Sequence, residues 1–321
     1  MTTMSKTEIV NDLDEVKENI EKYLQDDSDV LKTNIDFIAF IEVDNANPNG
    51  NPTNGMPRQC NDDRGLITDV CIKSKIRKYL HAKNYEIYLH NAQTLMMTDK
   101  VSRGVSSLQD ILLDNKDFAL LKNKGNTKNM YDKKLMCGVA LRDYIDIRLF
   151  GFTPTFKGIE DVNIRGSLSI GDAISVCPVE LNHAGQGIVK GLPFSTASDT
   201  MGQRYRIQHG LYKVTGGIGK REAYNNHVTN KDMEVVKEAI GNMFLYDASV
   251  ARPRGSMSVM CLYWVEHNKD YDARRIYDSV VVKMKDDVDY PTCYADYVIA
   301  DSALHELERY DNEMNITIPI N

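Results

Sequence analysis

The chain has 321 residues, of which 42% are hydrophobic and 26% are charged, and its formal net charge is −7. This composition is typical of soluble globular proteins, and no apolar run approaches the roughly 18 to 20 residues of a membrane span, so we expect a cytoplasmic protein without a membrane partner. Six scattered cysteines without a C-x-x-C pair argue against a disulfide framework and a zinc site, and we expect no metal and no cofactor.

Residues 1–34 are predicted to form an acidic helical appendage. Within them, residues 7–24 place apolar side chains three to four positions apart, which is typical of an amphipathic helix. Residues 1–34 hold nine acidic and four basic residues, and residues 270–321 hold twelve acidic and five basic ones. Since the whole chain has a net charge of −7, residues 35–269 carry a net charge of +5. Charge by itself favours an uneven solvated surface, but the basic middle of the chain allows a local site for a polyanion.

The first predicted strand covers residues 35–43, which are rich in β-branched and aromatic side chains. Residues 44–58, DNANPNGNPTNGMPR, follow it directly. Asparagine, proline and glycine make up most of this segment, so it can neither extend the strand nor begin a helix. We therefore expect a constrained loop, of which residues 47–58 supply amide side chains and one arginine.

The next predicted element is a helix over residues 70–80, with capping oxygens from Thr68 and Asp69. Lys73 and Arg77 are four positions apart and share a face of this helix. A helix start offers unpaired N–H groups and a positive dipole end, both of which attract phosphate. The loop and the helix together indicate a clamp for a nucleic-acid backbone, and a solvated helix after an asparagine-rich turn is an equally good interpretation on physical grounds alone.

The rest of the chain indicates a mixed α+β domain with long insertions. Residues 230–246 have the clearest helical periodicity in the chain. Residues 183–206 form a polar connection that is longer than an ordinary hairpin turn. Further strands are predicted over residues 166–176, 211–218, 256–265 and 277–284.

Two kinds of catalytic site are considered and set aside. Residues 216–220, GGIGK, lack the upstream glycine and the final Ser/Thr of a phosphate-binding loop, so we interpret the glycines as strand positions that another backbone approaches closely. The seven histidines are isolated in the sequence, and no metalloprotease or serine-hydrolase motif is present. We therefore expect a protein that is not an enzyme.

The loop and the first helix closely resemble the backbone subunit of CRISPR Cascade complexes, most of all the type I-C branch, with type I-B subunits as near relatives. The residues that carry the resemblance are Asn47-Pro48-Asn49-Gly50-Asn51-Pro52, Met56-Pro57-Arg58 and the run GLITDVCIKSKIRKYL from Gly65 to Leu80. Further matches are Arg165-Gly166, Thr200-Met201-Gly202, Gly210-Leu211-Tyr212 and Ala295-Asp296-Tyr297. The resemblance covers about residues 35 to 300.

The resemblance implies a modified RNA-recognition-motif (ferredoxin-like) core over residues 35–321. It also implies a finger-like helical insertion at about residues 81–160 and a thumb-like insertion at about residues 183–208. The glycine-aromatic strand signature by which such a fold usually contacts RNA is absent from this sequence. The expected fold class therefore rests on the resemblance, and the order of predicted strands and helices is compatible with it.

The resemblance also implies which residues bind guide RNA. The family positions matched here are Asn47, Asn49, Arg58, Thr68, Lys73, Arg77, Arg165, Met201, Arg204 and Arg206. Met201 corresponds to a wedge between bases, and Arg204 and Arg206 to contacts with neighbouring phosphates. The family usually has M-G-R-K at the thumb, whereas this chain has Gln203 after Gly202, so the register of the basic contacts departs from the family pattern here.

The implied function is a non-catalytic subunit that polymerises head to tail along a CRISPR guide RNA in antiviral defence. Its implied partners are the guide RNA, the target DNA strand paired with that guide, further copies of itself, and other Cascade subunits, namely a processing or cap subunit and a large subunit. The main alternative is an RNA-cleaving relative of the same fold, for which Asp44, Asp62, Asp63 and Asp161 are candidate catalytic residues without a matching motif. A stand-alone binding module is a third interpretation.

Overall fold

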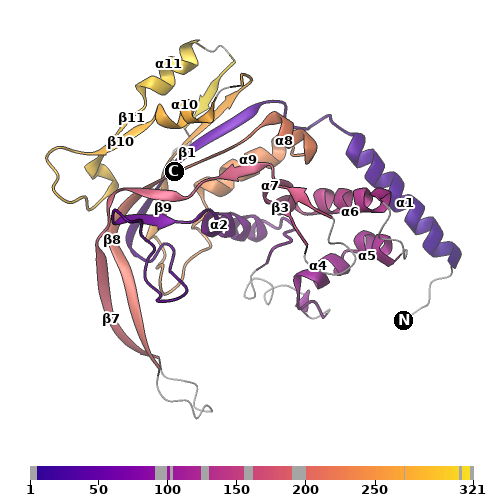
Figure 1. The fold of residues 1–321 in the computed structure, drawn as a ribbon, viewed down its shortest axis with the longest axis horizontal. Helices are drawn as coiled ribbons and strands as arrows, with labels where there is room; N and C mark the ends of the chain where they lie inside the picture. The colour runs from indigo at the N-terminus through magenta and orange to yellow at the C-terminus, as the bar shows by residue number, and fades with distance from the viewer. Residues whose placement is uncertain are drawn as a thin grey trace. The chain divides into compact units, whose positions relative to one another are not determined.

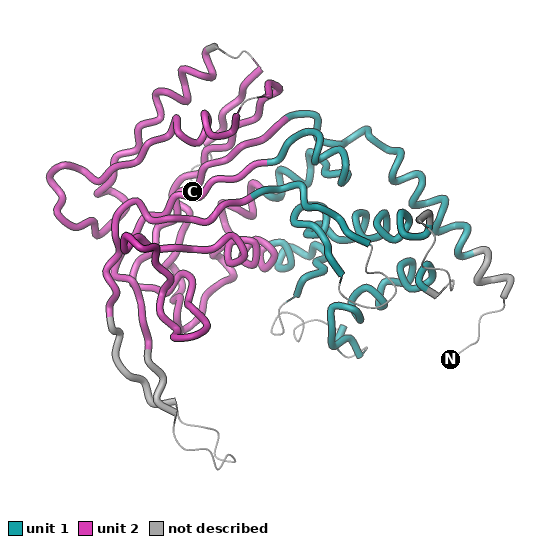
Figure 2. Tube along the Cα trace, viewed as in Figure 1, with its two compact units in different colours: residues 1–33, 80–169, 218–236 teal, residues 34–79, 170–217, 237–321 magenta. Residues whose placement is uncertain are grey.

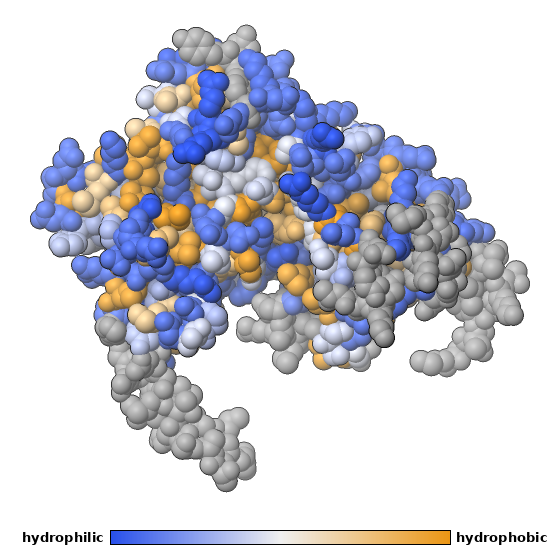
Figure 3. Space-filling view, viewed as in Figure 1, coloured by the Kyte–Doolittle hydropathy of each residue, from blue (hydrophilic) through white to orange (hydrophobic). Residues whose placement is uncertain are grey.

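A computed structural model describes residues 6–90, 100–101, 104–123, 130–154, 162–189, 200–270, 272–310 and 313–318. The chain divides into two compact units, each built from separate stretches of sequence (Figure 2). Unit 1 comprises residues 1–33, 80–169 and 218–236, and unit 2 comprises residues 34–79, 170–217 and 237–321. No helix among the described residues is both long enough and apolar enough to span a bilayer. Hydrophilic side chains surround smaller hydrophobic patches on the face shown in Figure 3, as on most folded proteins.

The main sheet has the strand order β12-β9-β1-β8-β6-β2, and β5 and β7 each pair with β8. Of these strands, Figure 1 labels β1, β7, β8 and β9. Its strands are β1 (Asn34–Ala46), β2 (Arg64–Ile67), β5 (Leu168–Ile170), β6 (Ala173–Pro178), β7 (Leu181–Val189), β8 (Thr200–Ile218), β9 (Met257–His267) and β12 (Asn315–Thr317). The pairs β1–β9, β9–β12, β2–β6, β6–β8 and β7–β8 are antiparallel. The β7–β8 pair forms a long hairpin at the place of the predicted thumb.

Four of these strands and two helices form the central βαββαβ motif. In chain order the motif runs β1, α2 (Asp69–Ala82), β6, β8, α9 (Asn230–Gly241) and β9, and in space the strands lie in the order β9-β1-β8-β6. This is the strand order of the ferredoxin-like arrangement that RNA-recognition motifs share. The predicted α+β class with such a core is therefore confirmed.

Side-chain alternation along β1 sends apolar residues to both faces of the sheet. Ile38 and Phe40 pack in a core with residues of the C-terminal elements, which are α10 (Ala273–Asp278), β10 (Val281–Met284), the 3-10 helix η2 (Tyr294–Asp296), β11 (Tyr297–Ala300) and α11 (Ser302–Tyr310). Phe37 faces the other way and stacks on Trp264, with 6.2 Å between the ring centroids. Lys237 of α9 lies over the same indole ring, so the helical layer covers this second face.

Unit 1 is mainly helical. It contains α1 (Lys6–Gln25), α4 (Leu108–Asp114), α5 (Lys116–Asn123), α6 (Met130–Asp143), α7 (Ile145–Phe150) and α8 (Lys220–Asn225), with the short strands β3 (Gly151–Phe152) and β4 (Ile164–Arg165). Val16 and Ile20 of α1 are buried in one core with residues of α4 to α7. A Cβ atom at Gly138 of α6 would collide with the Ile20 side chain, so the glycine permits close approach of α1 and α6.

Most element predictions are confirmed, and the differences have local causes. The predicted strand over residues 166–176 is interrupted and becomes β5 and β6. The prediction of a strand over residues 277–284 is wrong for its first residues, because α10 continues to Asp278 and only β10 is extended. Asp272 caps α10 by accepting a hydrogen bond from the backbone N–H of Arg274 at 3.0 Å. The apolar pattern from which the strand was predicted does not indicate this helix start.

Gly217 lies in β8, which confirms our interpretation of this glycine as a strand position. A Cβ atom there would collide with the Asp36 side chain and would lie 2.6 Å from the carbonyl oxygen of Ile35. We expect Gly217→Ala to lower the free energy of unfolding by about 1 to 3 kcal/mol, the usual cost of overpacking, as measured by urea denaturation. Gly171→Ala is the matched control because its Cβ atom would make an ordinary 3.5 Å contact with Thr215. Equal stability of the two variants would contradict the prediction.

Candidate nucleic-acid interface

The loop after β1 is held together by its own asparagines. Asn47 is only 6% exposed, and its Nδ2 donates a hydrogen bond to the carbonyl oxygen of Gly55 at 2.8 Å. Gly50 and Pro57 form an isolated antiparallel bridge that closes the loop. The side chain of Asn47 therefore shapes the loop from inside, which explains why an amide is placed at this position.

Asn49 joins the loop to the start of α2. Its Oδ1 accepts hydrogen bonds from both the backbone N–H and the hydroxyl of Thr68, each at 3.0 Å. Its carbonyl oxygen accepts a hydrogen bond from the backbone N–H of Arg58 at 3.1 Å. The structure thus brings together three of the predicted site residues, Asn49, Arg58 and Thr68.

The start of α2 offers fewer unpaired amides than its sequence predicts. The N–H of Asp69 donates to Asp172 Oδ1 at 2.8 Å, and the N–H of Cys71 donates to Thr68 Oγ1 at 3.4 Å. These two N–H groups and that of Thr68 therefore have acceptors within the chain and are not unpaired amides at the helix start.

Basic side chains line α2 and the loop beside it. Lys73 Nζ lies 2.9 Å from Asp69 Oδ2, with exposed side-chain fractions of 23% and 36%. The hydrogen bond from Lys73 holds the pKa of Asp69 below its ordinary value, so this carboxylate stays charged near neutral pH. Arg77 is half-buried one turn further along the helix, and Arg58 is half-buried at the end of the loop. The Arg58 Nε is buried and has no hydrogen-bond acceptor among the described residues.

Two predicted thumb residues lie on the described part of β8. Arg204 is exposed, and Arg206, two positions on and therefore on the same face of the strand, is half-buried. The Arg206 Nη2 donates to the carbonyl oxygen of Val250 at 3.0 Å, while its Nε is buried without an acceptor in the described structure. The side chain of Met201 lies outside the described residues.

Arg165 is the one predicted site residue that belongs to unit 1. Its side chain is exposed at the end of β4, and its carbonyl oxygen accepts a hydrogen bond from Asn226 Nδ2 at 2.7 Å. The other nine predicted residues belong to unit 2.

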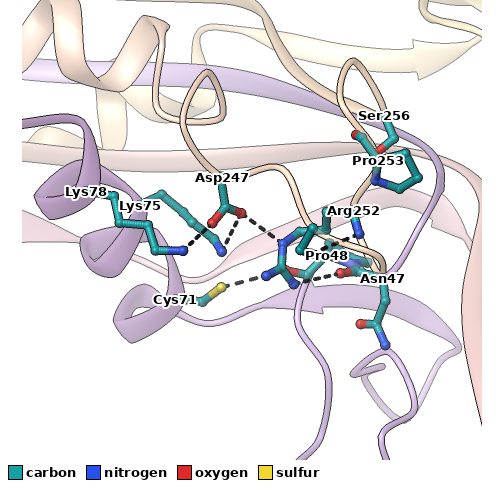
Figure 4. Close-up of polar contacts among 10 residues, drawn as sticks. Asn47, Pro48, Cys71, Lys75, Lys78, Asp247, Arg252, Pro253 and Ser256 are labelled. Atoms are coloured by element: carbon teal, nitrogen blue, oxygen red, sulfur yellow. Dashed lines mark hydrogen bonds and ion pairs between the residues drawn. The ribbon is translucent and has the colours of Figure 1, made fainter. Parts of the chain in front are cut away.

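A cluster of three cations around a buried carboxylate was not predicted from the sequence (Figure 4). Asp247 is 3% exposed, and its carboxylate lies 2.5 Å from Lys75 Nζ, 2.7 Å from Lys78 Nζ and 2.8 Å from Arg252 Nε. Lys75 and Lys78 were visible as helix lysines, but their shared partner comes from a distant part of the chain. With three positive charges against one negative charge, the cluster stays cationic beside the loop.

The electrostatics of this cluster follow from its burial. Burial alone would raise the pKa of Asp247, but the charge of Lys75, hydrogen bonds from Lys75 and Lys78 and the charge of Arg252 together lower this pKa below its ordinary value. Burial also lowers the pKa of Lys75, and the negative charge of Asp247 opposes that shift. Asp247 is therefore ionised at neutral pH.

The aspartates considered for RNA cleavage do not form a metal-binding group in the described structure. Asp44 and Asp63 are exposed, and Asp62 pairs with Arg64 at 2.7 Å. Asp161 lies outside the described residues. Among the residues that the structure describes, no three His, Cys, Asp or Glu side chains gather in a way that could hold a metal ion.

Comparison with known proteins places these elements in a family. The model of the family described as CRISPR-associated protein Cas7 matches residues 33–301. A chain of a solved "CRISPR RNA-guided surveillance complex, pre-nicking" has 11% sequence identity and a TM-score of 0.47, and 87% of each chain is covered. A chain of a "CRISPR RNA-guided surveillance complex" has 10% identity and a TM-score of 0.39, with 74% of this chain and 77% of that chain covered. No curated protein matches the chain. The family match includes the loop, α2 and the β7–β8 hairpin.

Proposed function

Since this chain belongs to the CRISPR-associated protein Cas7 family, we propose that it binds a CRISPR guide RNA as a non-catalytic, repeated backbone subunit of a surveillance complex. The observation that carries the proposal is the meeting of Asn49, Arg58 and Thr68 beside the basic face of α2, inside the segment that matches the family. Arg and Lys side chains hold phosphates without reading sequence, which suits a subunit that must accept any guide.

Each element has a separate part in the proposed contact. Lys73, Arg77 and Arg58 bind the ribose-phosphate backbone, and Asn47 and Asn49 hold the loop in the shape that presents Arg58. On the thumb, Met201 separates bases, and Arg204 and Arg206 bind the flanking phosphates. Arg165 provides a further phosphate contact from unit 1. In this proposal, residues 81–160 are the finger and residues 183–208 are the thumb.

The proposal also assigns the chain to a type I-C complex, with type I-B as the near alternative. The partners are then further copies of the chain along one guide, a processing or cap subunit, a large subunit, and the target DNA strand through guide pairing. Head-to-tail contacts that do not close into a ring produce a helical filament, which matches the geometry of a long guide.

RNA-dependent assembly is the test of this function. With a guide-length RNA, we expect light scattering after size-exclusion chromatography to show complexes of several protein copies, whereas the protein without RNA stays smaller. Two RNAs of equal length and unrelated sequence should bind with similar affinity, and the affinity should fall steeply between about 50 and 200 mM salt. A single protein copy on the RNA would instead indicate a stand-alone binding module.

The same preparation tests the enzymatic alternative. Labelled precursor and target RNAs are incubated with the protein, with and without a divalent metal, and we expect them to stay intact. A specific cut that is abolished by substitution of Asp44, Asp62 or Asp63 would overturn the non-catalytic role.

A further inference from the structure

The carboxylate of Asp247 connects two segments that flank the proposed RNA-binding loop. Two of its three cations, Lys75 and Lys78, belong to α2, and the third, Arg252, belongs to the connection between α9 and β9 (Figure 4). Lys75 and Asp247 have exposed side-chain fractions of only 7% and 2%. Separating a buried ion pair is costly because it leaves an uncompensated charge. The cluster therefore holds α2 against the connection between α9 and β9.

Arg252 also contacts the loop after β1. Its Nε contacts Asp247, and its Nη1 donates to the carbonyl oxygen of Asn47 at 3.3 Å. In return, the backbone N–H of Asn47 donates to the carbonyl oxygen of Ala251 at 2.9 Å. The Sγ of Cys71 on α2 lies 3.7 Å from the carbonyl oxygen of Pro48, so the first residues of the loop are held from both sides.

The restraint reaches the residues that are proposed to contact RNA. Asn47 Nδ2 binds the carbonyl oxygen of Gly55, and Asn49 binds Thr68 and the backbone of Arg58. Contacts therefore run from Asp247 through Arg252 to Asn47 and Gly55, and Asn49, two residues after Asn47 in the same loop, is bound by the backbone N–H of Arg58. A loop that is already in its binding conformation loses less entropy when it binds.

The negative charge of Asp247 is unfavourable for RNA binding. A carboxylate beside a phosphate-binding surface repels RNA, and Asp247→Asn removes this negative charge from the cluster. Attraction of RNA by Asp247 itself therefore does not account for its presence, whereas its contact with Arg252, which binds Asn47, favours a role in holding the loop.

We propose that Asp247 is a positioning residue, which acts through Arg252 to hold residues 47–58 in the conformation that binds the guide-RNA backbone. The proposal rests on the proposed function for its RNA-binding consequence, but the positioning itself can be measured without RNA.

The central experiment uses Asp247→Asn in the full-length protein. We expect the amide hydrogens of residues 47–58 to lose protection against hydrogen exchange, and the affinity for a guide-length RNA to fall about tenfold although a negative charge has been removed. Arg252→Lys keeps the charge but has no fork to contact Asp247 and Asn47 together, so it should give the same loss of loop protection. Arg252→Lys also keeps the test available if Asp247→Asn does not fold.

Asp278→Asn is the charge-matched control. Asp278 pairs with Arg274 at 3.1 Å with exposed side-chain fractions of 67% and 81%, so its removal makes the same charge change without loosening the loop. Unchanged exchange in residues 47–58 of both Asp247→Asn and Arg252→Lys, or RNA binding by Asp247→Asn that equals or exceeds the wild type, would overturn the proposal. Absence of RNA binding by the wild-type protein would instead refute the proposed function, and the exchange data would still decide the positioning role.

Discussion

Reversal of Lys73 and Arg77 to glutamate is expected to abolish RNA-bound assembly while the protein stays folded. Both side chains lie on α2, whose start is joined to the loop by Asn49 and Thr68, and the double variant changes the local charge by four units in the unfavourable direction. Loss of two phosphate contacts, together with repulsion, should weaken RNA binding by at least about 100-fold near physiological salt. Filter binding over a series of salt concentrations measures the effect, and the loss of two contacts should lower the salt slope by about two.

The control for this experiment is Arg274→Glu with Arg275→Glu on α10. This pair makes the same charge change at helix positions that lie outside the proposed interface. In the test variant, Lys73→Glu puts a second carboxylate one helical turn from Asp69, which should cost only a few tenths of a kcal/mol of stability. Unchanged assembly in the α2 variant, or an equal loss in the α10 variant, would count against the assignment of these residues to the RNA interface.

The largest expected effect on stability comes from Arg148→Ala in unit 1. The guanidinium of Arg148 binds both carboxylate oxygens of Asp232, at 3.0 and 2.8 Å, and the two side chains are only 13% and 9% exposed. Its Nη1 also donates to the carbonyl oxygens of Leu141 and Arg142 at the end of α6, at 2.6 and 3.1 Å. We expect Arg148→Ala to lower the free energy of unfolding by about 3 to 5 kcal/mol, because the buried carboxylate of Asp232 loses its partner. Urea denaturation measures this change.

Asp232 cannot turn away to water without a further cost. It forms a reciprocal capping pair with Thr229 at the start of α9, with both hydrogen bonds at 3.0 Å. Arg142→Ala is the matched control, since Arg142 also contacts two carboxylates, of Asp117 and Asp143, but is 26% exposed. Arg142→Ala should lower the free energy of unfolding by only about 1 kcal/mol. Similar losses in the two variants would contradict the view that burial decides the effect.

Some features of the site were predictable because they depend on neighbours in the sequence. The composition of residues 44–58 requires a loop, and the periodicity of residues 70–80 requires a helix that presents Lys73 and Arg77 together. Motif resemblance supplied the expected function and the expected core. The structure confirms the core through the strand order β9-β1-β8-β6, which no local pattern contains.

Other features were beyond prediction because they depend on contacts between distant segments. Periodicity marks Lys75 as an ordinary helix lysine, yet it is buried because Asp247 from the connection after α9 neutralises it. The helix start was expected to offer unpaired N–H groups to phosphate, but the N–H groups of Thr68 and Asp69 donate to Asn49 and Asp172.

The sequence by itself determined the local elements of this protein: the amphipathic helix at its start, the constrained loop, the basic helix and the strands around them. Only the tertiary structure decided which faces of these elements meet, namely α1 with α6, Arg148 with Asp232, and Asp247 with three cations. The physical reason is the distance in sequence over which each effect acts. Apolar periodicity and capping act between residues three or four positions apart. The pairing of buried charges, in contrast, depends on where the folded backbone places distant residues.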